Sequence, residues 1–374
     1  MLKKSVVCAA VIAAATCIAA PAQADPADSH AGTLALLQRE LTQAPGAAVY
    51  AGDANGSWNL QVGTGDTSAN VPIQPDQHFR IGSQTKTFTA AVVLQLVDEG
   101  KVDLNAPIER YLPGVVDGNG YNGNTVTVRD LLQQISGIPS NDTNPHPQQN
   151  PDGSYTLANL VKDGLSLKPN STPGTTFTYS NTNFEILGML IEQVTGEPVG
   201  DAITARIITP LGLTQTTFPK GGDRTLPAPY VHGYYGGTVG GFFFWYDNTG
   251  SFEPSLFSSA GGMLSTESDL AKFYQALITG KVVSAASLAL MQQTIPMTGA
   301  PAGYGYGLGL ISHALSCGGV AWGHAGNAPG YASWTAATAD GRYATVVANE
   351  EYAITGDNGD DLRFEVINSA MCGN

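Results

Sequence analysis

The sequence contains few charged residues, and basic residues are the scarcer kind. Only 17 of its 374 residues are Lys or Arg, against 31 Asp and Glu, which gives a formal net charge of −14. A chain this acidic repels the phosphate backbone of nucleic acids and anionic membrane surfaces. We therefore expect no nucleic-acid partner.

Long hydrophobic runs are absent except at the start of the chain. Lys3 and Lys4 precede an apolar segment over residues 6–20, and Ala22-Gln23-Ala24 follows it. This pattern is typical of a secretory signal peptide, so we expect residues 1–24 to be removed and the protein to be secreted and extracellular, without a membrane anchor. Removing Lys3 and Lys4, and no acidic residue, changes the formal charge from −14 to −16.

Cysteine is also scarce, and familiar hydrolase motifs are missing. Only Cys317 and Cys372 lie beyond the leader. An even count in an exported chain favours one disulfide, which would close a loop of about 56 residues and stabilise the fold by roughly 4 kcal/mol. Two free thiols are the alternative. The sequence has no Gly-x-Ser-x-Gly elbow and no His-Glu-x-x-His zinc helix, so we expect neither an α/β-hydrolase nor a metal site.

Strand patterns occur near both ends of the chain, and helical patterns fill the middle. Alternating hydrophobicity predicts strands over 47–51 and 58–62, joined at Asn55-Gly56, and over 319–322, 331–338 and 343–349. Helical periodicity predicts helices over 28–43, 84–98, 128–134, 157–164, 183–194, 201–208, 266–277, 285–292 and 357–370. We therefore predict an α+β fold in which an antiparallel sheet with terminal helices (25–98 and 262–374) carries an inserted, mainly helical lobe (99–261).

One lysine of this lysine-poor chain lies in a hydrophobic segment. Ser83-Gln84-Thr85-Lys86 opens a helix that is apolar on almost every face and is therefore expected to be buried. Ser83 and Lys86, three residues apart, lie on the same side of its first turn. A partly desolvated amine can take the proton of a serine hydroxyl, and N–H groups at a helix start can stabilise an oxyanion. The motif indicates a nucleophile and its base; the alternative is a serine that only caps the helix.

Two further segments carry side chains suited to acyl transfer. Tyr179-Ser180-Asn181 precedes an expected helix, where the tyrosine could relay protons and the asparagine could bind a substrate amide. His324-Ala325-Gly326 closes an expected strand, where the N–H of Asn327 could complete an oxyanion hole. Each segment alone is equally compatible with an ordinary capping turn or hairpin turn.

The three motifs, in this order, resemble the penicillin-binding serine hydrolases of the class C β-lactamase superfamily. The likeness is to secreted actinomycete DD-carboxypeptidase/transpeptidases and to related D-stereospecific amidohydrolases. Connecting segments match across nearly the whole mature chain, at residues 79–83, 94–101, 111–114, 136–137, 179–184 and 306–310. The resemblance implies the serine β-lactamase/DD-peptidase fold, and the two cysteines match the family's disulfide.

The resemblance also implies a role for each site residue. Ser83 would be acylated, and Lys86 and Tyr179 would form the proton relay. Asn181 would bind the substrate amide, with His324, Ala325, Gly326 and Asn327 along the substrate. The oxyanion would sit between the backbone N–H groups of Ser83 and Asn327. The family needs no cofactor, so we expect none.

Two positions depart from the carboxypeptidase pattern, and they affect the expected substrate. Ala325 stands where these enzymes usually have a hydroxyl residue, and Ile311 stands where they have an arginine; both family residues hold the substrate's terminal carboxylate. Losing one such charge-assisted hydrogen bond costs on the order of 1.5 to 3 kcal/mol, so substrates with a neutral leaving side should be favoured.

The main expectation is a D-alanyl-D-alanine carboxypeptidase/transpeptidase acting as a monomer on peptidoglycan-type or other D-amino-acid peptides, esters or amides and acylated by β-lactams. The alternatives are a D-stereospecific amidohydrolase, esterase or D-aminopeptidase, a class C-type β-lactamase, and a non-catalytic penicillin-binding sensor.

A glycine-flanked aromatic run, Phe242-Phe243-Phe244-Trp245-Tyr246, lies within residues 236–250. Glycines on both sides predict a mobile loop. Because five aromatic side chains are costly to expose, we expect the loop either to tuck into the helical lobe or to cover the acyl side of the cleft.

Overall fold

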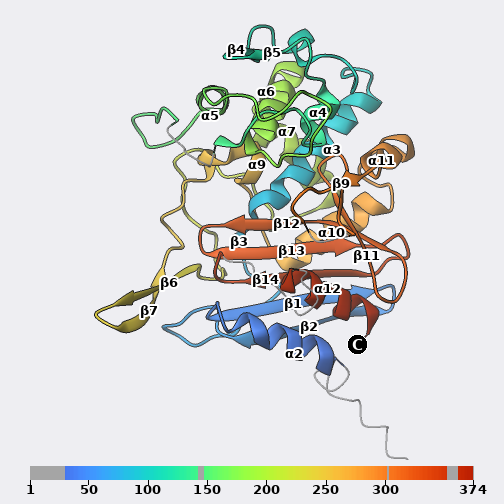
Figure 1. Ribbon diagram of the computed structural model, residues 1–374. Coiled ribbons are helices and arrows are strands. Elements are labelled where there is room, and N and C mark those ends of the chain that lie inside the picture. Colours follow the sequence, from blue (N-terminus) through green and yellow to red (C-terminus); the bar gives the residue numbers. More distant parts are fainter. Residues whose placement is uncertain (1–29, 142–146, 301–302, 352–360, 374) are drawn as a thin grey trace, which may run out of the picture.

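The computed structural model describes residues 30–141, 147–300, 303–351 and 361–373. Figure 1 shows an antiparallel sheet beneath a mainly helical region. The expected signal peptide, and the first residues expected for the helices over 28–43 and 357–370, lie outside these ranges. Within the described residues, no helix combines the length and apolar character needed to cross a membrane.

The sheet joins the two ends of the chain. Its eight strands run antiparallel in the order β2-β1-β14-β13-β12-β11-β10-β9, so the expected hairpin β1–β2 pairs directly with the C-terminal strand β14. The strands are β1 (Gly46–Asp53), β2 (Gly56–Gly63), β9 (Ile295–Pro296), β10 (Gly305–Tyr306), β11 (Ile311–Ala314), β12 (Val320–Ala328), β13 (Tyr331–Ala337) and β14 (Tyr343–Ala348).

Helices cover both faces of this sheet. Alternate residues of a strand point to opposite faces, so Ala47 and Val49 join the core beneath α2 (Ala31–Glu40) and α12 (Leu362–Cys372), whereas Ala48 joins the core on the other face. Helix α10 (Glu267–Ile278) packs on that second face. A disulfide joins Cys317, just before β12, to Cys372 at the end of α12.

The helical region is built around α3 (Thr85–Asp98), which the sequence predicted to be buried on all sides. Eleven of its 14 residues are buried, and it packs against α6 (Asn181–Thr195), α9 (Ser258–Gly261) and α11 (Ala285–Met291). The other helical segments are α4 (Val128–Leu132), α5 (Leu157–Gly164), α7 (Val199–Ile203), α8 (Thr209–Leu211), the short helices η1 (Gly82–Gln84), η2 (Ile108–Arg110) and η5 (Pro254–Leu256), and a π-helical turn, η4 (Thr204–Ile208). Short strands form two further pairs, β3 (Phe79–Arg80) with β8 (Leu264–Ser265) and β4 (Asp117–Gly118) with β5 (Tyr121–Asn122).

The fold class is therefore as predicted, a mixed α and β molecule with a large antiparallel sheet and terminal helices. The exact limits of the two lobes, 98/99 and 261/262, stay a prediction. One strand differs from expectation: β12 does not close at Gly323 but continues through His324 and Asn327 to Ala328, because these residues keep pairing with β13.

The aromatic run is also built differently from expectation. Residues 234–247 form a β-hairpin, β6 (Tyr234–Val239) and β7 (Phe242–Asp247), which projects from the body (Figure 1). The tucked position is wrong, since Phe242, Phe243, Phe244 and Tyr246 remain 48–72% exposed. The segment is a paired hairpin and not a loop, and its mobility stays a prediction. We call this hairpin the aromatic arm.

Candidate active site

Ser83 lies where a short helix touches the sheet. It belongs to η1, between β3 and the start of α3. A Cβ on Gly82 would lie 2.2 Å from the Asn327 carbonyl oxygen, and a Cβ on Gly326 would lie 2.0 Å from the Ile81 carbonyl oxygen. Since only glycine permits such an approach, these two glycines bring η1 and β12 into backbone contact. The segments that carry the N–H groups of Ser83 and Asn327 therefore lie against each other.

Lys86 is buried directly behind this serine. Its Nζ donates to Ser83 Oγ at 3.0 Å, to Asn181 Oδ1 at 2.6 Å and to the Ala260 carbonyl at 2.8 Å. The side chain is 0% exposed. Three acceptors around one buried ammonium or amine group fix its position. The lysine is thus held within hydrogen-bonding distance of the serine hydroxyl, away from bulk solvent.

Tyr179 and Asn181 reach the same point from the start of α6. The Lys86 Nζ lies 4.8 Å from the centre of the Tyr179 ring. The segment is held by Gln134, whose Oε1 accepts from the Ser180 N–H at 3.0 Å and from Asn183 Nδ2 at 2.6 Å. Gln134 itself has φ +62°, a conformation that costs a non-glycine residue energy and so indicates a constrained turn.

His324 lies on β12 at the other side of Tyr179. It is 1% exposed, and its Nε2 is 3.3 Å from the Tyr306 hydroxyl. Burial, with a smaller effect from the charge of Lys86, lowers the pKa of His324 to about 3. The imidazole is therefore neutral at physiological pH and provides polarity without positive charge.

These side chains open into one cleft of about 490 Å³. Among the described residues, its lining comprises Ser83, Tyr179, Asn181, Phe257, Ala260, Gly261, Met297, Ala300, Tyr304, Ile311, His324, Ala325, Asn327, Trp334, Glu351 and Asp361. The predicted residues Ser83, Tyr179, Asn181, His324, Ala325 and Asn327 are thus brought together, while Lys86 and Gly326 lie behind the wall.

The charged side chains of this lining are acidic. Glu351 Oε2 accepts from the Tyr235 hydroxyl at 2.6 Å. Asp361 is paired with buried Arg363, whose Nε lies 2.9 Å from Asp361 Oδ1. Arg363 also donates from Nη1 to Asn327 Oδ1 at 2.6 Å, so it holds β12 in place. In the part of the cleft that the structure describes, no Lys or Arg side chain lines the wall.

Sequence reasoning missed several residues of this site. Gln134, Ala260, Glu351, Asp361 and Arg363 belong to no recognisable motif, and each acts through a contact between distant segments. The Ala260 carbonyl, for example, comes from the single-turn helix α9, for which no sequence pattern was found. Within residues 30–373 as far as they are described, no group of three or more His, Cys, Asp or Glu side chains is placed to hold a metal ion.

Comparison with known proteins identifies the family and agrees with the fold. The Beta-lactamase family model matches residues 34–364. A D-stereospecific amidohydrolase from Streptomyces sp. is 36% identical with a TM-score of 0.81, over 92% of this chain and 99% of that one. The D-amino acid amidase from Ochrobactrum anthropi SV3, complexed with D-phenylalanine, is 26% identical with a TM-score of 0.79, over 92% and 98%.

Among curated proteins, protein flp of Staphylococcus aureus (strain MRSA252) is 30% identical over 203 residues. That match covers 53% of this chain but 40% of the relative, so the chain spans less than half of the length of that protein. The family model, by contrast, extends from α2 into α12 and includes every residue of the site described above. The chain therefore belongs to the Beta-lactamase family, within the serine hydrolases.

Proposed function

We propose that this protein is a D-stereospecific serine amidohydrolase, which cleaves amides and esters of D-amino acids through an acyl-Ser83 intermediate. The observation that carries the proposal is the buried Lys86 amine, 3.0 Å from Ser83 Oγ, at a cleft whose described charged lining is acidic. The two similar solved structures, an amidohydrolase and an amidase by name, support the same reading.

The reaction begins with attack of Ser83 Oγ on the substrate carbonyl carbon. The hydroxyl proton passes to Lys86 Nζ, for which the amine must be neutral at that moment. The developing oxyanion is stabilised by the N–H groups of Ser83 and Asn327, a contribution worth about 10²–10³ in rate per donor. Tyr179, whose ring lies against Lys86, donates its phenolic proton to the leaving nitrogen and takes the former serine proton from Lys86, which is then neutral again. The C–N bond breaks and the amine departs as a neutral molecule.

Hydrolysis of the ester completes the cycle. Water attacks the acyl carbonyl carbon and gives one proton to Lys86. The bond between that carbon and Ser83 Oγ then breaks, Ser83 Oγ takes the proton back, and the D-amino acid leaves. Asn181 Oδ1 accepts a hydrogen bond from Lys86 Nζ at 2.6 Å. The side-chain NH₂ group of Asn181 can therefore donate to the acyl part of the substrate. His324 remains neutral throughout, because burial keeps its pKa at about 3.

The charge of the cleft distinguishes this proposal from a carboxypeptidase. A D-alanyl-D-alanine substrate ends in a carboxylate, which needs a cation or a hydroxyl donor where this chain has Ile311 and Ala325. Glu351 would repel such a carboxylate and attract a substrate ammonium group, whereas the charge of Asp361 is already balanced by Arg363. Neutral amides and esters of D-amino acids meet neither difficulty, so the amidohydrolase alternative replaces the carboxypeptidase as the proposed activity. We further propose that the enzyme acts outside the cell, since residues 1–24 have the pattern of a signal peptide.

Substrate comparison tests this proposal directly. We expect kcat/KM for D-phenylalanine amide to exceed both that for its L-enantiomer and that for an acyl-D-Ala-D-Ala peptide. Ala325→Thr should raise the rate on the D-Ala-D-Ala acid, relative to its amide, by about tenfold or more, because one charge-assisted hydrogen bond is gained. Ala325→Val is the control, because valine has the shape of threonine but no hydroxyl group. Preference of the wild type for the free acid would contradict the proposal.

A further inference from the structure

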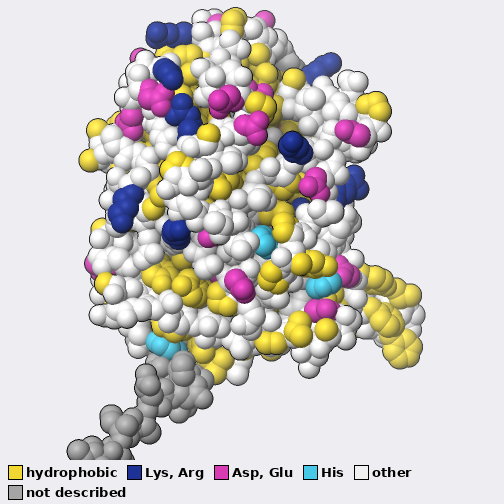
Figure 2. All heavy atoms as spheres, turned by 180° about the vertical axis from the view of Figure 1, so that it is seen from behind, with side chains coloured by type: hydrophobic (Ala, Val, Ile, Leu, Met, Phe, Trp, Pro, Cys, Tyr) yellow, Lys and Arg dark blue, Asp and Glu magenta, His cyan; other side chains and the backbone are white. Residues whose placement is uncertain are grey.

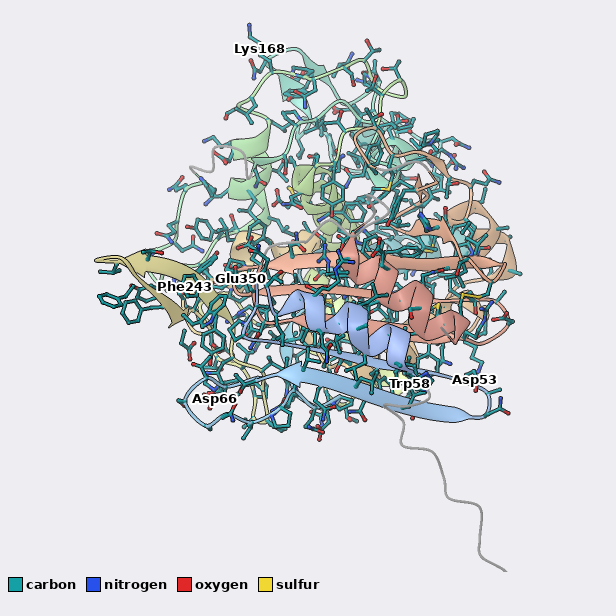
Figure 3. The ribbon with its side chains drawn as sticks, turned by 60° about the horizontal axis from the view of Figure 1, so that its bottom comes forward. Asp53, Trp58, Asp66, Lys168, Phe243 and Glu350 are labelled. Carbon is teal, nitrogen blue, oxygen red and sulfur yellow. A yellow bond between two sulfur atoms is a disulfide. The ribbon has the colours of Figure 1, made fainter. Side chains whose placement is uncertain are left out.

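The aromatic arm is the largest exposed apolar feature of the described residues. Val239, Phe242, Phe243, Phe244 and Tyr246 are exposed by 59, 72, 58, 50 and 48%. The other large hydrophobic side chains with such exposure, Leu41, Val71 and Val320, are scattered and only 40–42% exposed. Figure 2 shows the hydrophobic side chains of the arm standing clear of the body, and Figure 3 shows Phe243 near its outer end. Apolar patches of this kind mark interaction sites in soluble proteins.

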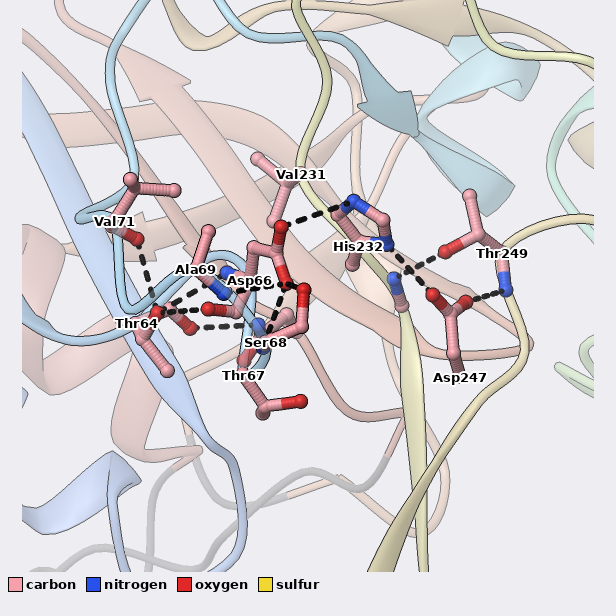
Figure 4. Close-up of polar contacts among 12 residues, drawn as sticks. Thr64, Asp66, Thr67, Ser68, Ala69, Val71, Val231, His232, Asp247 and Thr249 are labelled. Atoms are coloured by element: carbon pink, nitrogen blue, oxygen red, sulfur yellow. Dashed lines mark hydrogen bonds and ion pairs between the residues drawn. The ribbon is translucent and has the colours of Figure 1, made fainter.

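The base of the arm is fixed firmly to the body. His232, just before β6, is 2.6 Å from Asp247 at the end of β7, and its other ring nitrogen is 3.7 Å from Asp66 (Figure 4). The Tyr234 N–H donates to the Asn349 carbonyl, and the Gly236 N–H donates to Glu350, which Figure 3 places at the base. These contacts fix the orientation of the hairpin relative to the body, and in this orientation its aromatic side chains are exposed.

The arm is also organised internally. The rings of Phe243 and Trp245 pack edge to face, with centres 4.9 Å apart. Both rings lie across Gly236 on the neighbouring strand, where an added Cβ would be 2.8 Å from Phe243 and 3.0 Å from Trp245. Phe242 and Phe244 are on the opposite face of β7 and stay at least half exposed. One face of the hairpin is therefore partly covered by its own rings, and the other remains open.

The outer half of the arm lacks a partner strand within the described structure. β6 and β7 pair with each other as a two-stranded sheet, and the one further bridge, Tyr234 with Glu350, is at the base. A flat hydrophobic edge strand is a template for pairing with another strand, and an isolated two-stranded hairpin is marginally stable in water. Residues 237–239 and 242–244 thus offer both backbone hydrogen-bonding groups and apolar side chains.

Charge and area indicate which partner fits. Residues 235–246 contain no charged side chain, although the whole chain has a formal net charge of −14. The partner surface should therefore be uncharged and apolar as well, and the arm of a second copy meets that requirement while the two acidic bodies stay apart. Val239, Phe242, Phe244 and Tyr246 share the open face of the hairpin and present on the order of 450 Å². With the strand edge, this approaches the roughly 500 Å² per partner that a specific interface needs, so dimerisation should depend on concentration.

We propose that two copies of this chain form a dimer through their aromatic arms, strand edge against strand edge about a two-fold axis, with Phe242 and Phe244 of each copy packed on the other. Such an interface is self-complementary, as two-fold symmetry requires. It replaces the monomer expected from the sequence. The proposal is independent of the proposed activity, because no residue of 237–246 is among the described residues that line the cleft.

Molar mass in solution tests the dimer. We expect light scattering after size exclusion, and sedimentation equilibrium, to give twice the mass of one chain for the wild type. Phe242→Thr with Phe244→Thr keeps strand propensity and the Phe243–Trp245 contact, so the hairpin should remain. This variant should raise the dimer dissociation constant by about tenfold or more and leave amidase activity unchanged. Val71→Thr with Val320→Thr removes exposed apolar groups elsewhere and should stay dimeric.

Three results would overturn the proposal. A wild type that remains monomeric at every concentration has no such interface. Equal dimerisation of the wild type and the Phe242/Phe244 variant would place the interface elsewhere. A monomeric wild type that co-sediments with phosphatidylcholine vesicles, while the variant does not, would make the arm a lipid-binding element instead.

Discussion

Gly326 is the residue at which a single methyl group should test the geometry of the site. A Cβ there would lie 2.0 Å from the Ile81 carbonyl oxygen and 2.9 Å from Ser333 Oγ, whereas ordinary contacts begin at 3.4 Å. Gly326→Ala must therefore push β12 and η1 apart by about 1 Å, and a misplacement of this size can cost about 100-fold in rate. The carbonyl oxygen belongs to backbone that cannot turn aside, so little relief is available.

The displaced segment carries Asn327, whose N–H is one of the two proposed oxyanion donors. Losing one such donor lowers kcat by about 10²–10³. We therefore expect kcat/KM of Gly326→Ala on a chromogenic D-phenylalanine anilide to fall by about 10²–10³, mainly through kcat, because the donor acts most strongly on the transition state. Acylation by benzylpenicillin should slow by a similar factor.

Gly250→Ala is the matched control. A Cβ at Gly250 meets no atom within 4 Å, and its backbone is not in the left-handed region. This variant should keep wild-type activity. Circular dichroism should show that both variants are folded. If folded Gly326→Ala retains activity within about threefold of the wild type, less than 1 kcal/mol of barrier, then the contact between η1 and β12 does not form the oxyanion site and the reasoning is refuted.

Three further changes should have separable effects. Lys86→Met keeps the length of the side chain but removes the base, so kcat should fall by about 10²–10⁴ while substrate binding changes little; unchanged steady-state rates would exclude the lysine as base. Burial raises the pKa of Glu267 to about 8, so its contribution to stability is complete below the unfolded value of 4.5 and is lost as pH rises through about 8. Glu267→Gln should therefore flatten the fall of the melting temperature between pH 5 and pH 9 in calorimetry, and an unaltered slope would contradict the shift. Replacing Cys317 and Cys372 together by serine should lower the free energy of unfolding by about 2–4 kcal/mol, measured in urea, with a loss below 1 kcal/mol counting against the loop-closure argument.

Much of the fold could be predicted because local patterns and tertiary structure agree. The α3 segment is apolar on almost every face and 11 of its 14 residues are buried, and the β1–β2 hairpin follows from its alternating strands and the turn at residues 54–55. The full length of β12 could not be predicted, because Gly323, His324 and Gly326 together are typical of a turn. They stay in the strand since the neighbouring strand β13 pairs with them residue by residue.

The site was predictable only where its residues carry their own chemistry. Ser83, Lys86, Tyr179 and Asn181 stand out by type and order, whereas Gln134, Ala260 and Arg363 contribute through a backbone carbonyl or a supporting hydrogen bond. Such contacts depend on which distant segments touch, and no single sequence pattern records that.

For the aromatic arm, the amino-acid composition led to a wrong prediction. Its composition suggested burial, because exposed aromatic side chains are unfavourable in water. The two-residue turn Gly240-Gly241 and the alternation of β7 instead form a hairpin, which the His232–Asp247 contact directs away from the body. A hydrophobic segment need not be covered by its own chain when another molecule can cover it.

The central claim, that Ser83 forms a covalent ester with the help of Lys86, is tested most directly by intact-protein mass spectrometry. Wild-type protein, Ser83→Ala and Lys86→Met are each exposed to a large excess of benzylpenicillin, because its carboxylate should bind weakly beside Glu351 and Ala325, and any adduct is located by peptide mapping. The account predicts one added penicillin on Ser83 in the wild type, none in Ser83→Ala, and much slower labelling in Lys86→Met. An adduct that persists in Ser83→Ala, or that forms as fast in Lys86→Met as in the wild type, would contradict it.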